Sequence, residues 1–204
     1  MNAPSRRLAT GVALLLGARG AVATDLTLEV SDPDGKPVAD AVVYAAPVTG
    51  TAPPVRPKLR AIIDQVHKEF VPRVSIVQTG TEIFFPNSDN IRHSIYSFSP
   101  AKTFATKLYS GREAAPVLFD TTGLVILGCN IHDTMVAWVF VVDTPWFGKT
   151  DADGASTIKG IPPGEYRISA AAPAPSGNLK SIEMTLRVGG DGPQRQSVSL
   201  LAGG

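Results

Sequence analysis

Short apolar segments separated by turn residues run through most of the chain. Near the start, Leu26, Leu28 and Val30 alternate with polar residues, the turn sequence DPDGKP follows, and the apolar run resumes as DAVVYA. An alternation of period two indicates strands with one buried face, and Asp, Gly and Pro between two such runs favour a turn. We therefore expect a hairpin-like pair of strands here.

The same pattern continues to the end of the chain. Strand-like runs recur in FVPRVSIVQTGTEIFFPNSDN, HSIYSFS, VLFDTTGLVILG and MVAWVFVVDT, and later in GKTDADGASTIKGIPPGEYRISAAAP, SIEMTLRV and QSVSLLA. Only residues 61–69 have a spacing that would also suit a short helix. Many short strands divided by glycine and proline turns predict an all-β fold, built as a sandwich or barrel.

The first 23 residues have the three parts of an export signal. Arg6 and Arg7 make a positive start, an apolar stretch follows, and the segment ends in the small-residue sequence AVA. The apolar stretch is too short for a membrane span, and no other segment approaches the roughly 20 apolar residues that a span needs. We expect a signal peptide over 1–23, a periplasmic mature protein and no transmembrane segment after cleavage; a core helix or an irregular N-terminus is the alternative.

Charge and cysteine content narrow the possible functions. Cleavage after residue 23 removes three arginines and no acid, which changes the formal net charge from +1 to −2. A chain with this charge lacks the basic surface typical of nucleic-acid binding. Cys129 is the only cysteine, so it has no partner for the disulfide that an oxidising compartment favours. It is a buried bystander, an intermolecular link, a reactive thiol or a metal ligand.

The segment GCNIHDTM places this cysteine near a histidine and a methionine. Cys129 ends one predicted strand, His132 lies in a predicted turn, and Met135 begins the next strand, so thiolate, imidazole and thioether can converge. Soft sulfur ligands favour Cu(I), imidazole suits Cu(II), and a trigonal Cys-His-His set with an axial Met is the electron-transfer geometry for copper. The second histidine required is His93, directly before the run SIYSF. The pattern predicts one type 1 copper ion held by these four residues.

The alternatives are a zinc site, a set of unrelated core residues and an enzyme. Zinc also binds Cys and His, but a thioether is a poor zinc ligand. A cysteine nucleophile would need an oriented base, and nothing in the sequence resembles an oxyanion site. With four protein ligands there is no open metal position for a substrate, so we do not expect an enzyme. The remaining histidine, His67, is expected on the surface, with a fifth metal ligand or a partner contact as the alternative.

Residues from about Phe70 to Asp143 resemble a cupredoxin of the plastocyanin and amicyanin type. The segment FVPRVSIVQTGTEIFFPNSD is similar to the start of that family, and the spacing C-x2-H-x2-M is that of an amicyanin-like loop. The phrases HSIYSFSPAK and LGCNIHDTM resemble exported bacterial proteins of the methylamine-utilisation type. Two departures are Ser94, where many cupredoxins have asparagine, and Ile131, where many have proline.

A second resemblance covers both ends of the chain. VSDPDGKPVADAVVYAAP and GKTDADGASTIKGIPPGEYRISA are similar to the opening and closing parts of a carboxypeptidase-regulatory-like or transthyretin-like sandwich. This implies a first sandwich part at 24–50, a proline-rich linker at 51–60, a cupredoxin Greek-key sandwich at 61–145 and a second sandwich part at 146–204. A loop of a domain tolerates such an insertion because domain termini often lie close together. Two consecutive domains are the alternative.

Three functions follow from these expectations. The first is a periplasmic single-electron carrier between redox protein partners; the second is a carrier or sensor that stores or delivers copper; the third is a scaffold in which the copper domain is vestigial. Asp151 and Asp153 are expected in a turn rather than a calcium loop, because the rest of an EF-hand is missing. Five aromatic residues are expected to pack in the core or between domains rather than to carry electrons: Tyr96, Phe98, Trp138, Trp146 and Phe147.

Overall fold

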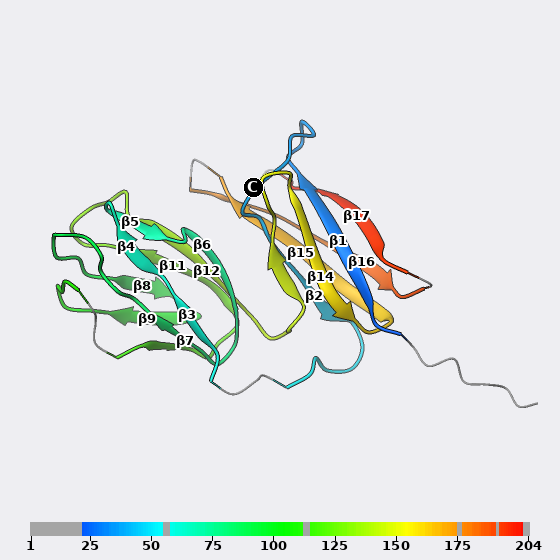
Figure 1. The fold of residues 1–204 in the computed structure, drawn as a ribbon, viewed down its shortest axis with the longest axis horizontal. Helices are drawn as coiled ribbons and strands as arrows, with labels where there is room; N and C mark the ends of the chain where they lie inside the picture. The colour runs from blue at the N-terminus through cyan, green and yellow to red at the C-terminus, as the bar shows by residue number, and fades with distance from the viewer. Residues whose placement is uncertain (1–21, 55–57, 112–114, 175–176, 191, 202–204) are drawn as a thin grey trace, which may run out of the picture.

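The computed structural model describes residues 22–54, 58–111, 115–174, 177–190 and 192–201, and there every regular element is a strand (Figure 1). The predicted all-β class is confirmed. All but the last two residues of the predicted export signal, and residues 55–57 of the predicted linker, lie outside the described part of the chain. Over the described residues, no helix has the length and apolar character needed to cross a membrane.

Strands from both ends of the chain form two facing sheets, here called the split sandwich. One sheet has the order β14-β1-β17, and the other has the order β13-β2-β15-β16. Their bounds are β1 Thr24–Ser31, β2 Val42–Pro47, β13 Phe147–Lys149, β14 Ala155–Ile161, β15 Gly164–Pro173, β16 Leu179–Val188 and β17 Gln194–Ser199. Strand β1 runs antiparallel to β14 and parallel to β17, so it lies between two strands from the other end of the chain (Figure 1).

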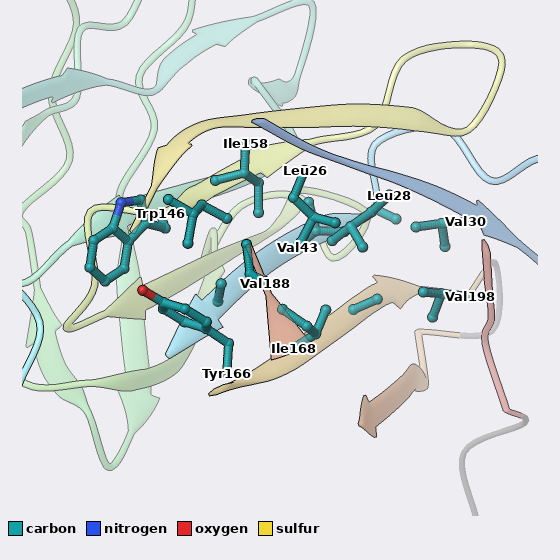
Figure 2. Packing of buried hydrophobic residues seen from close by; sticks show 14 of the residues in the cluster. Leu26, Leu28, Val30, Val43, Trp146, Ile158, Tyr166, Ile168, Val188 and Val198 are labelled. Atoms are coloured by element: carbon teal, nitrogen blue, oxygen red, sulfur yellow. The ribbon is translucent and has the colours of Figure 1, made fainter. Parts of the chain in front are cut away.

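The apolar positions that alternate along β1 point into the core of the split sandwich. Leu26, Leu28 and Val30 are at most 2% exposed, and they pack with buried residues of the facing sheet. Trp146 and Tyr166 lie at one end of this cluster, with ring centroids 5.5 Å apart (Figure 2). Period-two alternation therefore identifies the buried face of β1 correctly.

The predicted hairpin of the first two strands is wrong, because β1 and β2 lie in different sheets. The turn between them forms as expected: the Asp32 carboxylate accepts the backbone N–H groups of Asp34 and Lys36. After this turn the chain passes from one sheet to the other, so that the apolar faces of β1 and β2 pack against each other in one cluster. A turn of this composition can therefore connect strands of two facing sheets as well as the two strands of a hairpin.

The middle of the chain forms a second pair of sheets, here called the central sandwich. One sheet has the order β6-β12-β11-β8-β9, the other has the order β10-β7-β3, and β4 and β5 form a separate hairpin. Their bounds are β3 Arg60–Ile62, β4 Asp64–Val66, β5 Glu69–Val71, β6 Val74–Gln78, β7 Thr81–Phe84, β8 Tyr96–Ser99, β9 Lys102–Ala105, β10 Val117–Phe119, β11 Gly123–Gly128 and β12 Val136–Val142. An apolar cluster fills the space between the sheets, and it includes Cys129 and Met135.

Residues 61–69 form strand segments and a turn rather than a helix, and the last residue of the predicted linker, Arg60, already belongs to β3. The reason is a period of two across this segment: Ile63 and Gln65 are buried while their neighbours are partly or fully exposed. His67 and Lys68 then have positive φ values of 54° and 61°, which a helix cannot contain.

A third apolar cluster joins the two sandwiches. Val42 and Ala171 of the split sandwich pack with Val74, Trp138 and Phe140 of the central sandwich. The predicted division into domains stays a prediction. Strands within residues 24–47 pair with strands within residues 147–199, and strands within residues 60–142 pair with one another.

Candidate metal centre

The loop that carries three of the predicted ligands joins β11 to β12, and the two strands pair along the whole of β11. Strands β11 and β12 are in antiparallel register from Gly123 opposite Val141 to Gly128 opposite Val136. The loop is closed by a hydrogen bond from the Met135 N–H to the His132 carbonyl at 3.0 Å. The paired strands on both sides of the loop and this hydrogen bond therefore fix the positions of Cys129, His132 and Met135.

Glycine at 128 leaves room for a close approach just before the cysteine. A Cβ added there would lie 2.6 Å from the Tyr96 ring, which crosses the end of β11 from the neighbouring strand β8. The Ile131 N–H then points at the Cys129 sulfur, with an N to Sγ distance of 3.5 Å.

His93 comes from a distant part of the sequence and is held by its backbone. It forms two hydrogen bonds with Tyr109, His93 N–H to the Tyr109 carbonyl at 3.0 Å and the reverse at 2.9 Å. The His93 side chain is fully buried, and its Nδ1 lies 3.8 Å from Cys129 Sγ. The His93 and His132 rings approach edge to face, with centroids 5.2 Å apart.

The structure brings three of the four predicted residues to one point. One ligand atom from each of His93, Cys129 and His132 lies within 4.8 Å of the others. The Nδ1 of His132 is buried and has no hydrogen-bond partner within the described residues. Met135 is 1% exposed and packs in the same cluster as Cys129. Two convergent imidazoles, a thiol and a buried thioether suit copper, and an unpaired buried nitrogen is a group that a metal would satisfy.

Asp89 is part of this centre and was missed by sequence reasoning. Its Oδ2 lies 2.8 Å from the Nε2 of His93, on the side of the ring away from Cys129. Burial tends to raise the pKa of Asp89, but hydrogen bonds from the Lys68 N–H, the His93 ring and the His67 N–H together hold that pKa below its usual value. The available signals were its place at the end of the segment FVPRVSIVQTGTEIFFPNSD and its position four residues before His93.

Other expectations have mixed outcomes. His67 is exposed, as predicted, and lies in the turn between β4 and β5. Phe98 is 78% exposed, so the prediction that it packs in a core is wrong; strand alternation places it on the outer face of β8. Asp151 lies in a turn as predicted, since its Oδ1 accepts the N–H groups of Asp153 and Ala155.

Each of the two departures from the cupredoxin pattern is next to a predicted ligand histidine in the sequence. Ser94 is buried, and its hydroxyl has no hydrogen-bond partner among the residues described. Ile131 is 50% exposed beside the partly exposed His132.

Comparison with solved structures returns copper proteins, whereas no family model and no curated protein matches the chain. A copper-containing nitrite reductase from Thermus scotoductus SA-01 is 23% identical over 56% of this chain and 28% of its own, with a TM-score of 0.38. A purple cupredoxin from Nitrosopumilus maritimus is 20% identical over 41% of this chain and 99% of its own, with a TM-score of 0.35. An oxidised amicyanin variant is 17% identical over 41% and 81%, with a TM-score of 0.36.

These three structures are of the kind that the sequence resembles. The match spans less than a third of the nitrite reductase chain. Because the identities are 23% or lower and the TM-scores are 0.38 or lower, these similarities do not indicate a function. The case for a metal therefore rests on the residues of this chain.

Proposed function

We propose that the chain is a periplasmic type 1 copper protein that carries single electrons between redox protein partners. The observation that carries the proposal is the convergence of His93, Cys129 and His132, with a buried His132 Nδ1 that has no hydrogen-bond partner among the described residues. Together with the buried Met135, these residues would hold one copper ion. When bound, copper would supply a one-electron Cu(II)/Cu(I) couple.

The surroundings of the ligands support electron transfer over simple metal storage. Cys129, His132 and Met135 are placed by the paired strands β11 and β12, and His93 is placed by its two backbone bonds to Tyr109. Ligands held by the fold move little between oxidation states, which keeps the reorganisation cost of electron transfer low. His132 is partly exposed whereas His93 is fully buried, so the His132 edge is the proposed point of electron entry.

Export through the N-terminal signal and the absence of an enzyme activity belong to the same proposal. Four protein ligands would leave no metal position for a substrate. A copper carrier that releases the metal would use the same four residues. The two functions differ in whether the metal stays in place when it is reduced.

The test is a Cu(II) titration of the mature protein, followed by visible absorption and electron paramagnetic resonance. We expect an intense thiolate-to-copper band at one equivalent, bleached by ascorbate and restored by an oxidant. Cys129→Ser and His132→Gln should abolish the band. Met184→Leu is the control, because it removes a thioether that packs against the core of the split sandwich, outside the centre, and should leave the band unchanged.

Two results would contradict the proposal. Copper that leaves the protein on reduction would support the carrier function instead. A weak signal that survives Cys129→Ser would remove the type 1 site altogether.

A further inference from the structure

The Asp89 carboxylate joins the candidate ligand His93 to the turn between β4 and β5. Its Oδ2 lies 2.8 Å from His93 Nε2, and the same carboxylate accepts the backbone N–H groups of His67 at 2.6 Å and of Lys68 at 2.9 Å. The Asp89 side chain is 10% exposed. One nearly buried group thus contacts a metal-site residue and a separate strand pair.

These contacts decide which nitrogen of His93 carries the proton. Backbone amides can only donate, so both oxygens of Asp89 act as acceptors toward the turn. An imidazole nitrogen beside such an acceptor is held as N–H, which leaves the other ring nitrogen with a free lone pair. In His93 the other nitrogen is Nδ1, which faces Cys129 Sγ at 3.8 Å. This is the tautomer that a metal bound at Nδ1 requires.

The turn depends on the same carboxylate. His67 and Lys68 form a two-residue connection between the paired residues Val66 and Glu69, and both have positive φ. Asn-Gly is the usual choice for such a turn, because other side chains are strained in the left-handed region. Lys68 stands where this turn favours glycine, so the hydrogen bonds that Asp89 accepts from the His67 and Lys68 N–H groups offset the strain.

We infer that Asp89 is a positioning residue that presents His93 Nδ1 to the metal and holds the β4–β5 turn, so that metal loading and the order of this turn are coupled. The coupling rests on the proposed copper function, whereas the choice of tautomer does not. A metal that fixes the His93 ring also fixes the carboxylate beside it, and an ordered turn favours metal binding to the same degree.

The first experiment uses nitrogen-15 NMR of the histidine side chains in the full metal-free protein. We expect His93 to be the Nε2–H tautomer in the wild type and a mixture of tautomers in Asp89→Ala. Cu(I) affinity, measured by competition with a chromophoric chelator, should fall about 10- to 100-fold in this variant.

Ser88→Ala is the matched control for this variant. Ser88 also ties this loop to β4, through a 2.7 Å hydrogen bond to Asp64 Oδ2, and its side chain is exposed. It should leave both the tautomer and the affinity unchanged. An equal loss of affinity in Ser88→Ala would overturn the inference, because any loosening of the loop would then be enough.

A second measurement needs no variant and stands even if Asp89→Ala does not fold. Copper loading of the wild type should slow hydrogen exchange at the His67 and Lys68 amides. The matched amides are those of Asp34 and Lys36, which also donate to an aspartate, Asp32, in the split sandwich, and they should not respond.

A His93 found as Nδ1–H in the metal-free wild type, or equal exchange at both pairs of amides, would overturn the inference. A wild type that binds no copper would refute the proposed function alone. In that case the tautomer in the metal-free protein still decides the role of Asp89.

Discussion

The substitution Gly154→Ala tests a close approach between the turn before β14 and the neighbouring strand β1. Gly154 has a φ of +74°, and its carbonyl accepts the N–H of Val30 at 2.8 Å. A Cβ added there would lie 2.5 Å from the Val30 carbonyl oxygen and 3.1 Å from Pro37 Cβ. The backbone oxygen cannot rotate away as a side chain could, so the strands have to shift.

Gly160→Ala separates this clash from backbone strain. Gly160 has a similar φ of +66°, but an added Cβ meets no atom within 4 Å. The left-handed conformation costs an alanine about 1–2 kcal/mol at either site. Forced overpacking adds about 1–3 kcal/mol at Gly154 only. We expect a loss of roughly 1–2 kcal/mol for Gly160→Ala and of about 2–5 kcal/mol for Gly154→Ala.

The assay is urea unfolding followed by the fluorescence of Trp146, which is 8% exposed in the core of the split sandwich. All variants carry Trp138→Phe, so that Trp146 is the only tryptophan. If the two alanine variants lose the same free energy of unfolding to within about 0.5 kcal/mol, the argument from the close approach to Val30 is refuted.

Three further predictions concern single side chains. Met135→Leu should change the unfolding free energy of the metal-free protein by less than about 1.5 kcal/mol, since Met135 is buried and leucine conserves its volume, yet it should shift the copper absorption spectrum and potential; an unchanged spectrum would remove Met135 as a ligand. Burial raises the pKa of Tyr166 above its ordinary value near 10, so the folded form is favoured fully below pH 10 and loses stability as the pH rises through the higher folded pKa. Urea midpoints should therefore fall above pH 10 in the wild type and stay flatter in Tyr166→Phe, which also loses the hydrogen bond to the Pro162 carbonyl; parallel pH profiles would contradict this. Phe98→Ser should change stability by no more than about 0.5 kcal/mol, because Phe98 is 78% exposed; a thermal melt that shows a large loss would mean that its contact with Tyr96 matters more than exposure suggests.

Local patterns in the sequence determined the strand content and one half of the candidate site. Alternation along Leu26, Leu28 and Val30 predicts a buried face because the period of a strand is a local property of the backbone. The spacing of Cys129, His132 and Met135 likewise predicts convergence, because a short loop keeps its residues together wherever the strands pack.

Only the tertiary structure decided which strands pair with one another. The alternation in β1 could not show that its neighbours are β14 and β17, since one buried face can pair with many strands. It also could not show that Phe98 is exposed on the outer face of β8, because the period is the same on either face.

The other half of the candidate site was decided in the same way. The sequence supplied His93 as a residue type that the chemistry requires, but only the fold brings its Nδ1 to 3.8 Å from Cys129. Asp89 is the clearest example of a site residue that the sequence alone does not identify. It becomes part of the centre only because the fold brings its carboxylate to the His93 ring and to the N–H groups of His67 and Lys68. The hydrophobic period and the spacing of ligands are local properties of the sequence, whereas contacts between distant segments depend on how complete sheets pack.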